Sequence, residues 1–107
     1  MRALTAGWGD WLSVFEEHYA ALPAAAERRA CPNCGAERLR LAFTGLEPER
    51  VGYAAFWCDD CLFGIHVSRC QVPTGVPMDS LHTPVELRSV RIPNYTLLWP
   101  DEDERRA

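Results

Sequence analysis

The chain contains no lysine: its eleven basic residues are all arginine, and fifteen aspartates and glutamates outnumber them. The formal net charge of −4 speaks against a nucleic-acid surface, which normally carries a basic patch. Long apolar runs are also missing, because no stretch approaches the roughly 18 uninterrupted apolar residues of a membrane span. HExxH, P-loop, GxSxG and dinucleotide motifs are absent as well. The sequence therefore argues against a membrane protein and against the enzyme classes that these motifs mark.

An apolar run that ends in "AAA" before Glu27 gives the N-terminal region a partial likeness to a secretory signal. Asp10, Glu16, Glu17 and His18 interrupt this run, so we expect no signal sequence. A cytoplasmic location follows from this interpretation. In such a reducing compartment, the five cysteines favour metal binding over disulfides.

Size and composition are typical of one small globular domain. The chain is 48% hydrophobic and 24% charged. Its 107 residues can form a modest core, and a structural metal would add to the stability of so short a chain. We expect a single domain over residues 1–100 and a charged, mobile tail over residues 101–107.

Two CxxC pairs are the strongest signal in the chain. Cys31 and Cys34 in "CPNCG" repeat the spacing of Cys58 and Cys61, with 23 residues between the pairs. Two residues between ligands let the backbone turn around an ion, and Gly35 readily takes the positive φ that ends such a turn. The second pair, "CDDCLFG", lacks this glycine, so we expect its turn around the ion, its metal-binding knuckle, to be less regular. The spacing predicts one structural zinc ion, bound tetrahedrally by four thiolates with no position open to substrate.

Periodicity on either side of the first pair predicts a helix and three strands. Apolar residues recur at helical spacing behind Asp10, a candidate N-cap, which predicts an amphipathic helix over residues 10–22. "PAAAERRA" predicts a short second helix with proline at its first position. "ERLRLAF", "VGYAAFW" and "GIHVSRC" predict three strands of an antiparallel sheet, whose hairpin turn "TGLEPER" lies far from the metal. The apolar helix residues are Trp11, Leu12, Phe15, Tyr19 and Leu22.

Residues 30–70 resemble the zinc-ribbon group, small modules in which two CxxC knuckles clamp one structural zinc. "CPNCG" also resembles a rubredoxin knuckle. The resemblance implies that Cys31, Cys34, Cys58 and Cys61 are metal ligands, and it implies no specific activity. The expected fold class is therefore α+β, with a small zinc-ribbon-like three-stranded antiparallel sheet and an N-terminal amphipathic helix.

A C-terminal extension over residues 71–100 falls outside this resemblance. Thr83, Pro84 and Glu86 form a candidate capping box, which predicts a short helix through about Arg91 that Pro93 stops. "NYTLLW" then alternates, which predicts a last strand or an extended segment packed on the ribbon.

His66 and Cys70 are the side chains near the second pair that the metal does not use. On an extended third strand they share one face with Ser68, while Ile65 and Val67 lie on the other. They would be about 13 Å apart, too far for a nucleophilic cysteine–histidine dyad. We expect His66 to be a surface or interface side chain and Cys70 a small, half-buried one.

Two other clusters of polar residues are explained more simply as solvated side chains than as catalytic or metal-binding sites. Glu16, Glu17 and His18 are adjacent helical residues that point in different directions, so a solvated helix face is favoured over an acid–base cluster. Asp59 and Asp60 inside the second knuckle are interpreted as solvated rather than as a second cation site. No catalytic residue is predicted.

These observations predict a zinc-binding, non-catalytic accessory or protein-interaction module. Three alternatives use the same chain, and one of them, an enzyme, would need partners for His66 or Cys70 that the sequence does not reveal. A rubredoxin-like iron ion in the same four cysteines would make an electron carrier, and a patch of Arg28, Arg29, Arg38 and Arg40 would make a weak nucleic-acid binder.

The partner is expected to be another protein or a second copy of the chain, with no specific nucleic acid and no membrane. Aromatic side chains commonly dominate such contact surfaces. Packing of the helix aromatics on the domain's own sheet competes with this role. The candidate contact residues are Trp11, Phe15, Tyr19, Tyr95 and Trp99.

Overall fold

The computed structural model describes residues 6–22 and 29–99. In this part of the chain the fold is α+β, as predicted, with one N-terminal helix and a mixed five-stranded sheet. The predicted second helix falls almost entirely on residues 23–28, and these and the predicted tail lie outside the described residues. The elements are α1 (Trp8–Ala20), β1 (Leu39–Leu46), β2 (Val51–Cys58), β3 (Phe63–Gln71), β4 (Asp79–Ser80), a 3-10 turn (Val85–Leu87) and β5 (Thr96–Leu97).

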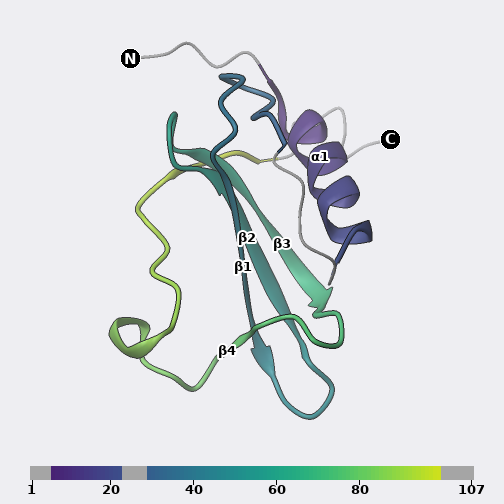
Figure 1. Ribbon diagram of the computed structural model, residues 1–107. Helices are drawn as coiled ribbons and strands as arrows, with labels where there is room; N and C mark the ends of the chain where they lie inside the picture. Colours follow the sequence, from purple (N-terminus) through teal and green to yellow (C-terminus); the bar gives the residue numbers. More distant parts are fainter. Residues whose placement is uncertain (1–5, 23–28, 100–107) are drawn as a thin grey trace.

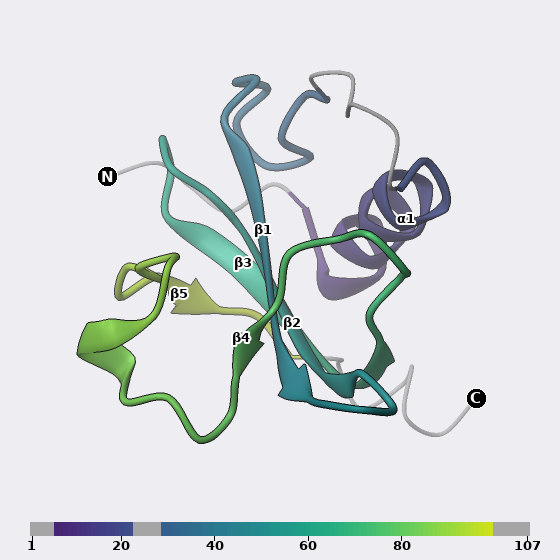
Figure 2. The ribbon, with the colours of Figure 1, turned by 60° about the horizontal axis from the view of Figure 1, so that its bottom comes forward.

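The three long strands form the antiparallel meander that their alternation predicts. Leu39 lies opposite Cys58, and Phe56 lies opposite Ile65. The sheet is wider than the three predicted central strands, in the order β4-β1-β2-β3-β5. β4, which was not predicted, pairs parallel with β1, and β5, which lies within the predicted last strand or extended segment, pairs parallel with β3. Figure 2 shows β4 beside β1 at one edge of the sheet. The prediction of a three-stranded sheet is therefore correct only for its centre.

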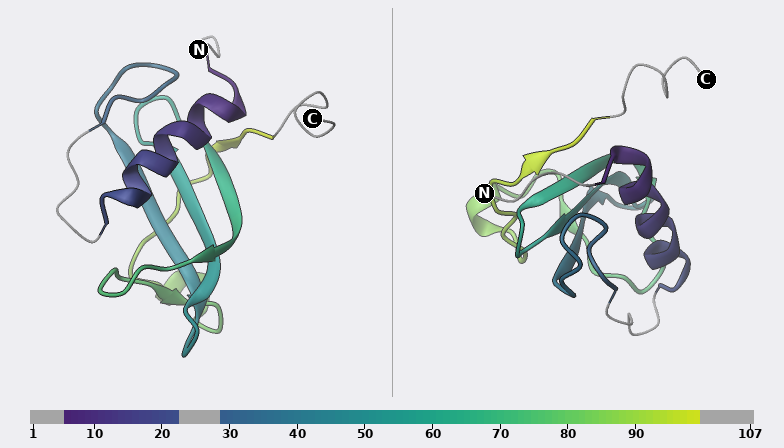
Figure 3. Two further views of the ribbon diagram at one scale, coloured as in Figure 1. Left: turned by 90° about the vertical axis from the view of Figure 1, so that its right-hand side faces the viewer. Right: turned by 90° about the horizontal axis from the view of Figure 1, so that it is seen from above.

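Helix α1 crosses one face of the long strands and builds the larger core (Figure 3). Trp11 is 0% exposed and Phe15 is 5% exposed. Both rings meet Phe56 of β2 edge to face, with ring centroids 5.9 Å and 5.8 Å away. Edge-to-face geometry is favourable for aromatic pairs beyond the area that they bury. The helix aromatics therefore fix α1 on the sheet.

The C-terminal extension covers part of the opposite face, on the far side of the sheet from α1 (Figure 1). Tyr95 stacks on Trp57 with ring centroids 5.8 Å apart and planes 10° apart. Its hydroxyl donates to the Ile65 carbonyl oxygen at 3.2 Å. Val90 and Ile92 pack on the same small cluster. Both faces of the sheet thus carry apolar packing.

The helix begins and ends two residues before the predicted bounds. Gly7 is the N-cap, in place of Asp10, and its N–H donates to the Asp10 carboxylate at 3.0 Å. A carboxylate in the first turn is also favoured by the helix dipole. No helix among the described residues combines the length and the apolar character that a bilayer span requires.

The predicted helix through Arg91 is wrong, since only the 3-10 turn at Val85–Leu87 forms there. The Asp79 carboxylate binds backbone N–H groups that such a helix would need for its own hydrogen bonds. Its carboxylate accepts hydrogen bonds from the Ser89 N–H at 2.9 Å, the Ser89 hydroxyl at 2.8 Å and the Val90 N–H at 3.3 Å. These bonds hold the segment extended, so that Val90 can pack on the sheet.

A β-bulge in β3 changes the predicted face of Cys70. Gly52 lies opposite Cys70 but Tyr53 lies opposite Ser68, so Arg69 is the extra residue, with φ 53°. An extra residue reverses the alternation beyond it. Cys70 is therefore 7% exposed and belongs to the core under α1, whereas His66 stays exposed on the other face.

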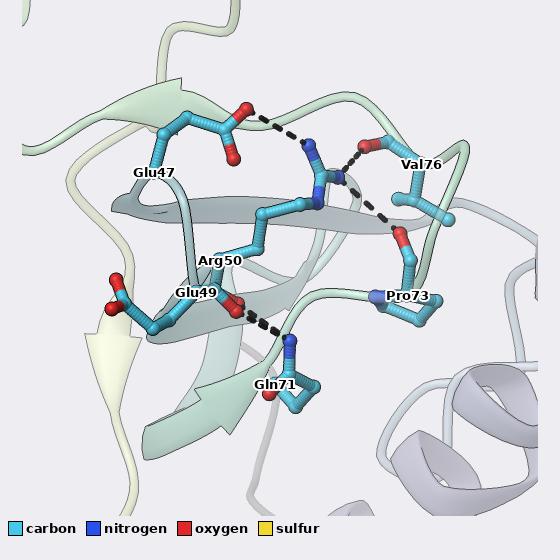
Figure 4. Close-up of polar contacts among 6 residues, drawn as sticks. All are labelled: Glu47, Glu49, Arg50, Gln71, Pro73 and Val76. Carbon is cyan, nitrogen blue, oxygen red and sulfur yellow. Dashed lines mark hydrogen bonds and ion pairs between the residues drawn. The ribbon is translucent and has the colours of Figure 1, made fainter.

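Arg50 ties the β1–β2 turn to the chain that leaves β3 (Figure 4). Its guanidinium donates to the carbonyl oxygens of Pro73, at 3.3 Å, and Val76. The Gln71 amide donates to the carbonyl oxygens of Glu49, at 2.8 Å, and Arg50, at 3.2 Å. These contacts close the end of the sheet that lies away from the cysteines.

Candidate metal centre

The four predicted ligands come together at one end of the sheet. The Sγ atoms of Cys31, Cys34, Cys58 and Cys61 all lie within 4.8 Å of one another. Two of the Sγ pairs, Cys31 with Cys61 and Cys34 with Cys58, are 3.7 Å apart. A tetrahedron with zinc–sulfur bonds of about 2.3 Å has sulfur–sulfur edges of about 3.8 Å. The sulfurs are thus spaced to hold a metal ion.

The first knuckle is a tight turn that precedes β1. Gly35 N–H donates to the Cys31 carbonyl oxygen at 2.9 Å, and Cys31 N–H donates to the Ala36 carbonyl oxygen at 2.8 Å. Gly35 has φ 80°, the conformation that favours glycine. The turn carries both sulfurs toward the second knuckle, and Figure 1 shows both knuckles at the end of the sheet opposite the β1–β2 turn.

The second knuckle repeats this turn, although the sequence predicts a less regular one. Leu62 N–H donates to the Cys58 carbonyl oxygen at 2.9 Å, and Leu62 has φ 57°. Leu62 thus takes the place that Gly35 has in the first knuckle. The prediction was wrong because a leucine can occupy a left-handed conformation when the surrounding structure requires it.

Backbone N–H groups point at two of the sulfurs. The N–H groups of Asn33 and Cys34 lie 3.3 Å and 3.4 Å from Cys31 Sγ, and the Asp60 N–H lies 3.4 Å from Cys58 Sγ. Such donors stabilise thiolates over thiols. Sequence reasoning missed the part of Asn33, whose only signal is its place inside the CxxC turn.

Burial works against ionisation of the cysteine sulfurs. Cys31 and Cys58 are 3% and 0% exposed. Burial raises the pKa of Cys31 to about 12, and it also raises the pKa of Cys58. At Cys61 burial also acts to raise the pKa, but hydrogen bonds, led by that of the Asn33 side chain, bring the pKa below its usual value. A bound cation must therefore displace protons from the buried thiols.

Asp59 has a structural role in the second knuckle. Its carboxylate accepts a hydrogen bond from the Trp57 indole N–H at 2.9 Å and pairs with Arg40 at 3.3 Å. Its own N–H donates to the Arg38 carbonyl oxygen at 2.9 Å. These partners fix the knuckle to the ends of β1 and β2, so Asp59 is not simply solvated.

His66 and Cys70 do not meet, as predicted, although for a different reason. The His66 ring packs at a tilt against Tyr53 with ring centroids 4.7 Å apart, and Arg88 donates to the Tyr53 hydroxyl at 3.2 Å. Cys70 faces the core on the other side of the sheet. His18, predicted to lie on a solvated helix face with Glu16 and Glu17, is half-buried and packs against Phe56, 5.8 Å between ring centroids.

In comparisons with family models, with curated proteins and with solved structures, no significant match to this chain was found.

Proposed function

We propose that the four cysteines hold one zinc ion as a structural centre and that the domain acts as a non-catalytic protein-interaction module. The observation that carries the proposal is the position of four sulfurs within 4.8 Å of one another, all supplied by the chain. A zinc ion with four protein ligands has no position for a substrate or an activated water. The five cysteines form no disulfide, which suits a reducing compartment such as the cytoplasm.

The position of the sulfurs supports a structural role. Cys31 and Cys34 precede β1, Cys58 ends β2 and Cys61 precedes β3. One ion would therefore join the ends of all three long strands. Because so small a domain has a limited core, metal binding would contribute directly to its folding free energy.

Iron in the same site is the second candidate, because the N–H groups that point at Cys31 and Cys58 suit an iron–cysteine centre as well as a zinc centre. Hydrogen bonds to the sulfurs help set the reduction potential of an iron–cysteine centre. An iron-loaded protein would be coloured and would bleach on reduction, whereas the zinc protein is colourless.

The protein-interaction part of the proposal rests on exposed aromatic surface. Trp11 and Phe15 are buried in the core, so they position α1 rather than bind a partner. Trp99 is 67% exposed, and Tyr19 and Tyr95 are partly exposed. The contact surface is therefore proposed to centre on Trp99 and the neighbouring flank of α1.

Nucleic-acid binding has less support. Arg29 lies 3.9 Å from Glu17 and Arg40 lies 3.3 Å from Asp59, so two of the four arginines considered for a basic patch face carboxylates. Four thiolates around a dication add further negative charge. We expect only weak, salt-sensitive binding to DNA or RNA.

A pair of cysteine variants tests the structural role of the ion. Cys34→Ser removes one ligand and is expected to lose zinc and unfold or aggregate the domain. Cys70→Ala changes a buried cysteine outside the centre and is expected to keep one zinc per chain. Elemental analysis and circular dichroism of both proteins decide the matter. Zinc loss from Cys70→Ala, or a folded, zinc-loaded Cys34→Ser protein, would contradict the proposal.

A further inference from the structure

The outer edge of β3 is only partly covered by β5. β5 pairs with Phe63 and Gly64 and then ends. Within residues 6–22 and 29–99, no strand lies beside the next part of this edge, His66 to Ser68. An uncovered strand edge presents backbone groups that can pair with another chain.

The pairing with β5 shows which backbone groups of β3 point outward. Thr96 N–H donates to the Leu62 carbonyl oxygen at 2.8 Å, and Leu98 N–H donates to the Gly64 carbonyl oxygen at 2.9 Å. These bonds already hold an extended segment on the edge. Because the direction of the backbone groups alternates along a strand, every second residue of β3 points the same way as Gly64.

His66 and Ser68 are the next two residues in this series. Their N–H and C=O groups therefore point away from β2, toward the uncovered edge. The bulge at Arg69 comes only after them, so it does not reverse their direction. Two donors and two acceptors thus continue the line of bonds that β5 begins.

Two cavities lie along the same edge, between β3 and α1. The first has a volume of ≈ 440 Å³ and is lined by Trp8 and Leu12 of α1 and by Trp99. The second has a volume of ≈ 320 Å³ and is lined by Phe15 and Tyr19 of α1 and by Arg69 and Cys70. Val67 lines both cavities. The view down onto α1 and the long strands in Figure 3 (left) shows the helix passing over this side of the sheet.

From this arrangement we infer that the groove between α1 and the β3 edge, lined by the residues of these two cavities, binds an extended peptide segment of a partner protein. The peptide adds a strand beside His66 and Ser68. Its side chains at alternate positions enter the two cavities, because residues i and i+2 of a strand point to the same face. The inference rests on the proposed role as a protein-interaction module and names its binding surface.

The charge of the groove and its continuity with β5 favour an extended peptide as the bound segment. Glu16 and Arg69 are the two charged residues that line the second cavity, and they have opposite signs. The remaining lining is mostly apolar, so a neutral peptide with alternating apolar residues fits it. The bound peptide extends an interface that β5 already forms along the same strand.

A random twelve-residue peptide library, displayed on phage and selected on the full-length zinc-loaded protein, is the probe. We expect selected peptides with apolar residues at alternate positions. The synthetic peptide should slow amide hydrogen exchange at His66 and Ser68. Protection at Leu41 and Phe43 on the β1 edge instead would place binding at the wrong side of the sheet and overturn the inference.

Ser68→Pro is the decisive variant, with Ser68→Ala as its matched control. Proline removes one outward N–H, and an edge position of this kind tolerates it within the sheet. We expect Ser68→Pro to weaken peptide binding about tenfold or more, with zinc content unchanged. Ser68→Ala keeps the N–H and should bind as the unmodified protein does.

Other outcomes separate this inference from the proposed function. A folded, zinc-loaded protein that selects no peptide, or whose peptide binding survives Ser68→Pro, overturns the groove and leaves the zinc centre intact. A dimer in solution that Ser68→Pro dissociates would assign the edge to a second copy and also overturn the peptide. A folded protein without zinc would instead contradict the proposed function.

Discussion

Leu62 and Gly35 occupy the same position in the two cysteine knuckles and have φ angles of 57° and 80°. Each donates its N–H to the carbonyl oxygen of the first cysteine of its knuckle at 2.9 Å. A left-handed conformation costs an L-residue about 1–2 kcal/mol, and it costs glycine almost nothing. The second knuckle therefore holds strain that the first avoids.

Leu62→Gly is expected to stabilise the zinc-loaded protein. Glycine removes the strain, and its greater freedom in the unfolded chain offsets part of the gain, which leaves about 0.5–1 kcal/mol. The Leu62 side chain is 41% exposed, so the packing of its buried part is lost as well, which sets the gain toward the lower end of this range. Urea unfolding in the presence of zinc measures the change.

Gly35→Ala is the converse substitution in the first knuckle and serves as the control. A Cβ at Gly35 meets no other atom within 4 Å, so the substitution tests the backbone conformation alone. We expect a loss of about 1 kcal/mol. A neutral Gly35→Ala together with a destabilising Leu62→Gly would show that the two knuckles are not equivalent.

Arg50→Ala should destabilise the closed end of the sheet by about 1–2 kcal/mol. The substitution removes the donor to the Pro73 and Val76 carbonyl oxygens. Arg50 has φ 58°, and alanine at the same φ carries the same backbone strain, so the comparison isolates the side chain. Thermal unfolding of the zinc-loaded protein is the measurement.

Glu47→Gln separates these hydrogen bonds from the ion pair. The Glu47 carboxylate lies 3.8 Å from Arg50 and is largely exposed, and exposed ion pairs contribute little. This variant should stay within about 0.5 kcal/mol of the unmodified protein. An effect as large as that of Arg50→Ala would assign the stabilisation to the ion pair instead.

His18 predicts a pH-dependent part of the stability. Burial, followed by the charge of Arg29, lowers the pKa of His18 below its ordinary value of 6.5. As the pH falls through that value, the unfolded chain binds a proton that the folded protein does not yet bind, so the folded state loses stability down to the lower folded pKa. Acidification from about pH 7.5 to about pH 5.5 should thus cost the unmodified protein more stability than it costs His18→Gln.

The measurement is the midpoint of urea unfolding of the unmodified protein and of each variant at both pH values. The difference between the unmodified protein and a variant is then compared between the two pH values, because an effect of pH on zinc binding that both proteins share cancels. His82→Gln serves as the control, since His82 is exposed. Equal pH dependence of the His18→Gln and unmodified proteins would contradict the burial of a neutral His18.

The sequence was sufficient for the parts of the fold that depend on local patterns. CxxC spacing identified Cys31, Cys34, Cys58 and Cys61, which the structure brings within 4.8 Å of one another. Alternation identified the three long strands, and helical spacing identified α1. Each of these signals lies within a short stretch of chain, where the residue period decides the structure.

The errors arose where tertiary contacts override local preference. Arg69 gives no sequence signal for a positive φ, so the bulge that turns Cys70 into the core was not predictable. The helix expected before Arg91 gave way to hydrogen bonds from Asp79 and to the packing of Val90 on the sheet. β4 has two residues, too few to show any periodicity, whereas β5 lies within "NYTLLW", whose alternation predicted a last strand or an extended segment.

The partner surface was predicted in part on residues that the fold buries. Trp11 and Phe15 fill the core, and helical spacing cannot distinguish a stripe that faces its own sheet from one that faces a partner. The exposure of Trp99 became known only with the structure.

The metal content of the protein tests the central proposal most directly. The protein should be purified without added zinc and analysed by native mass spectrometry and by elemental analysis. We predict one zinc ion per chain, with four protons displaced from the cysteine thiols relative to the fully protonated metal-free protein. A folded protein that contains no metal, or one iron ion per chain in place of zinc, would contradict the structural zinc centre.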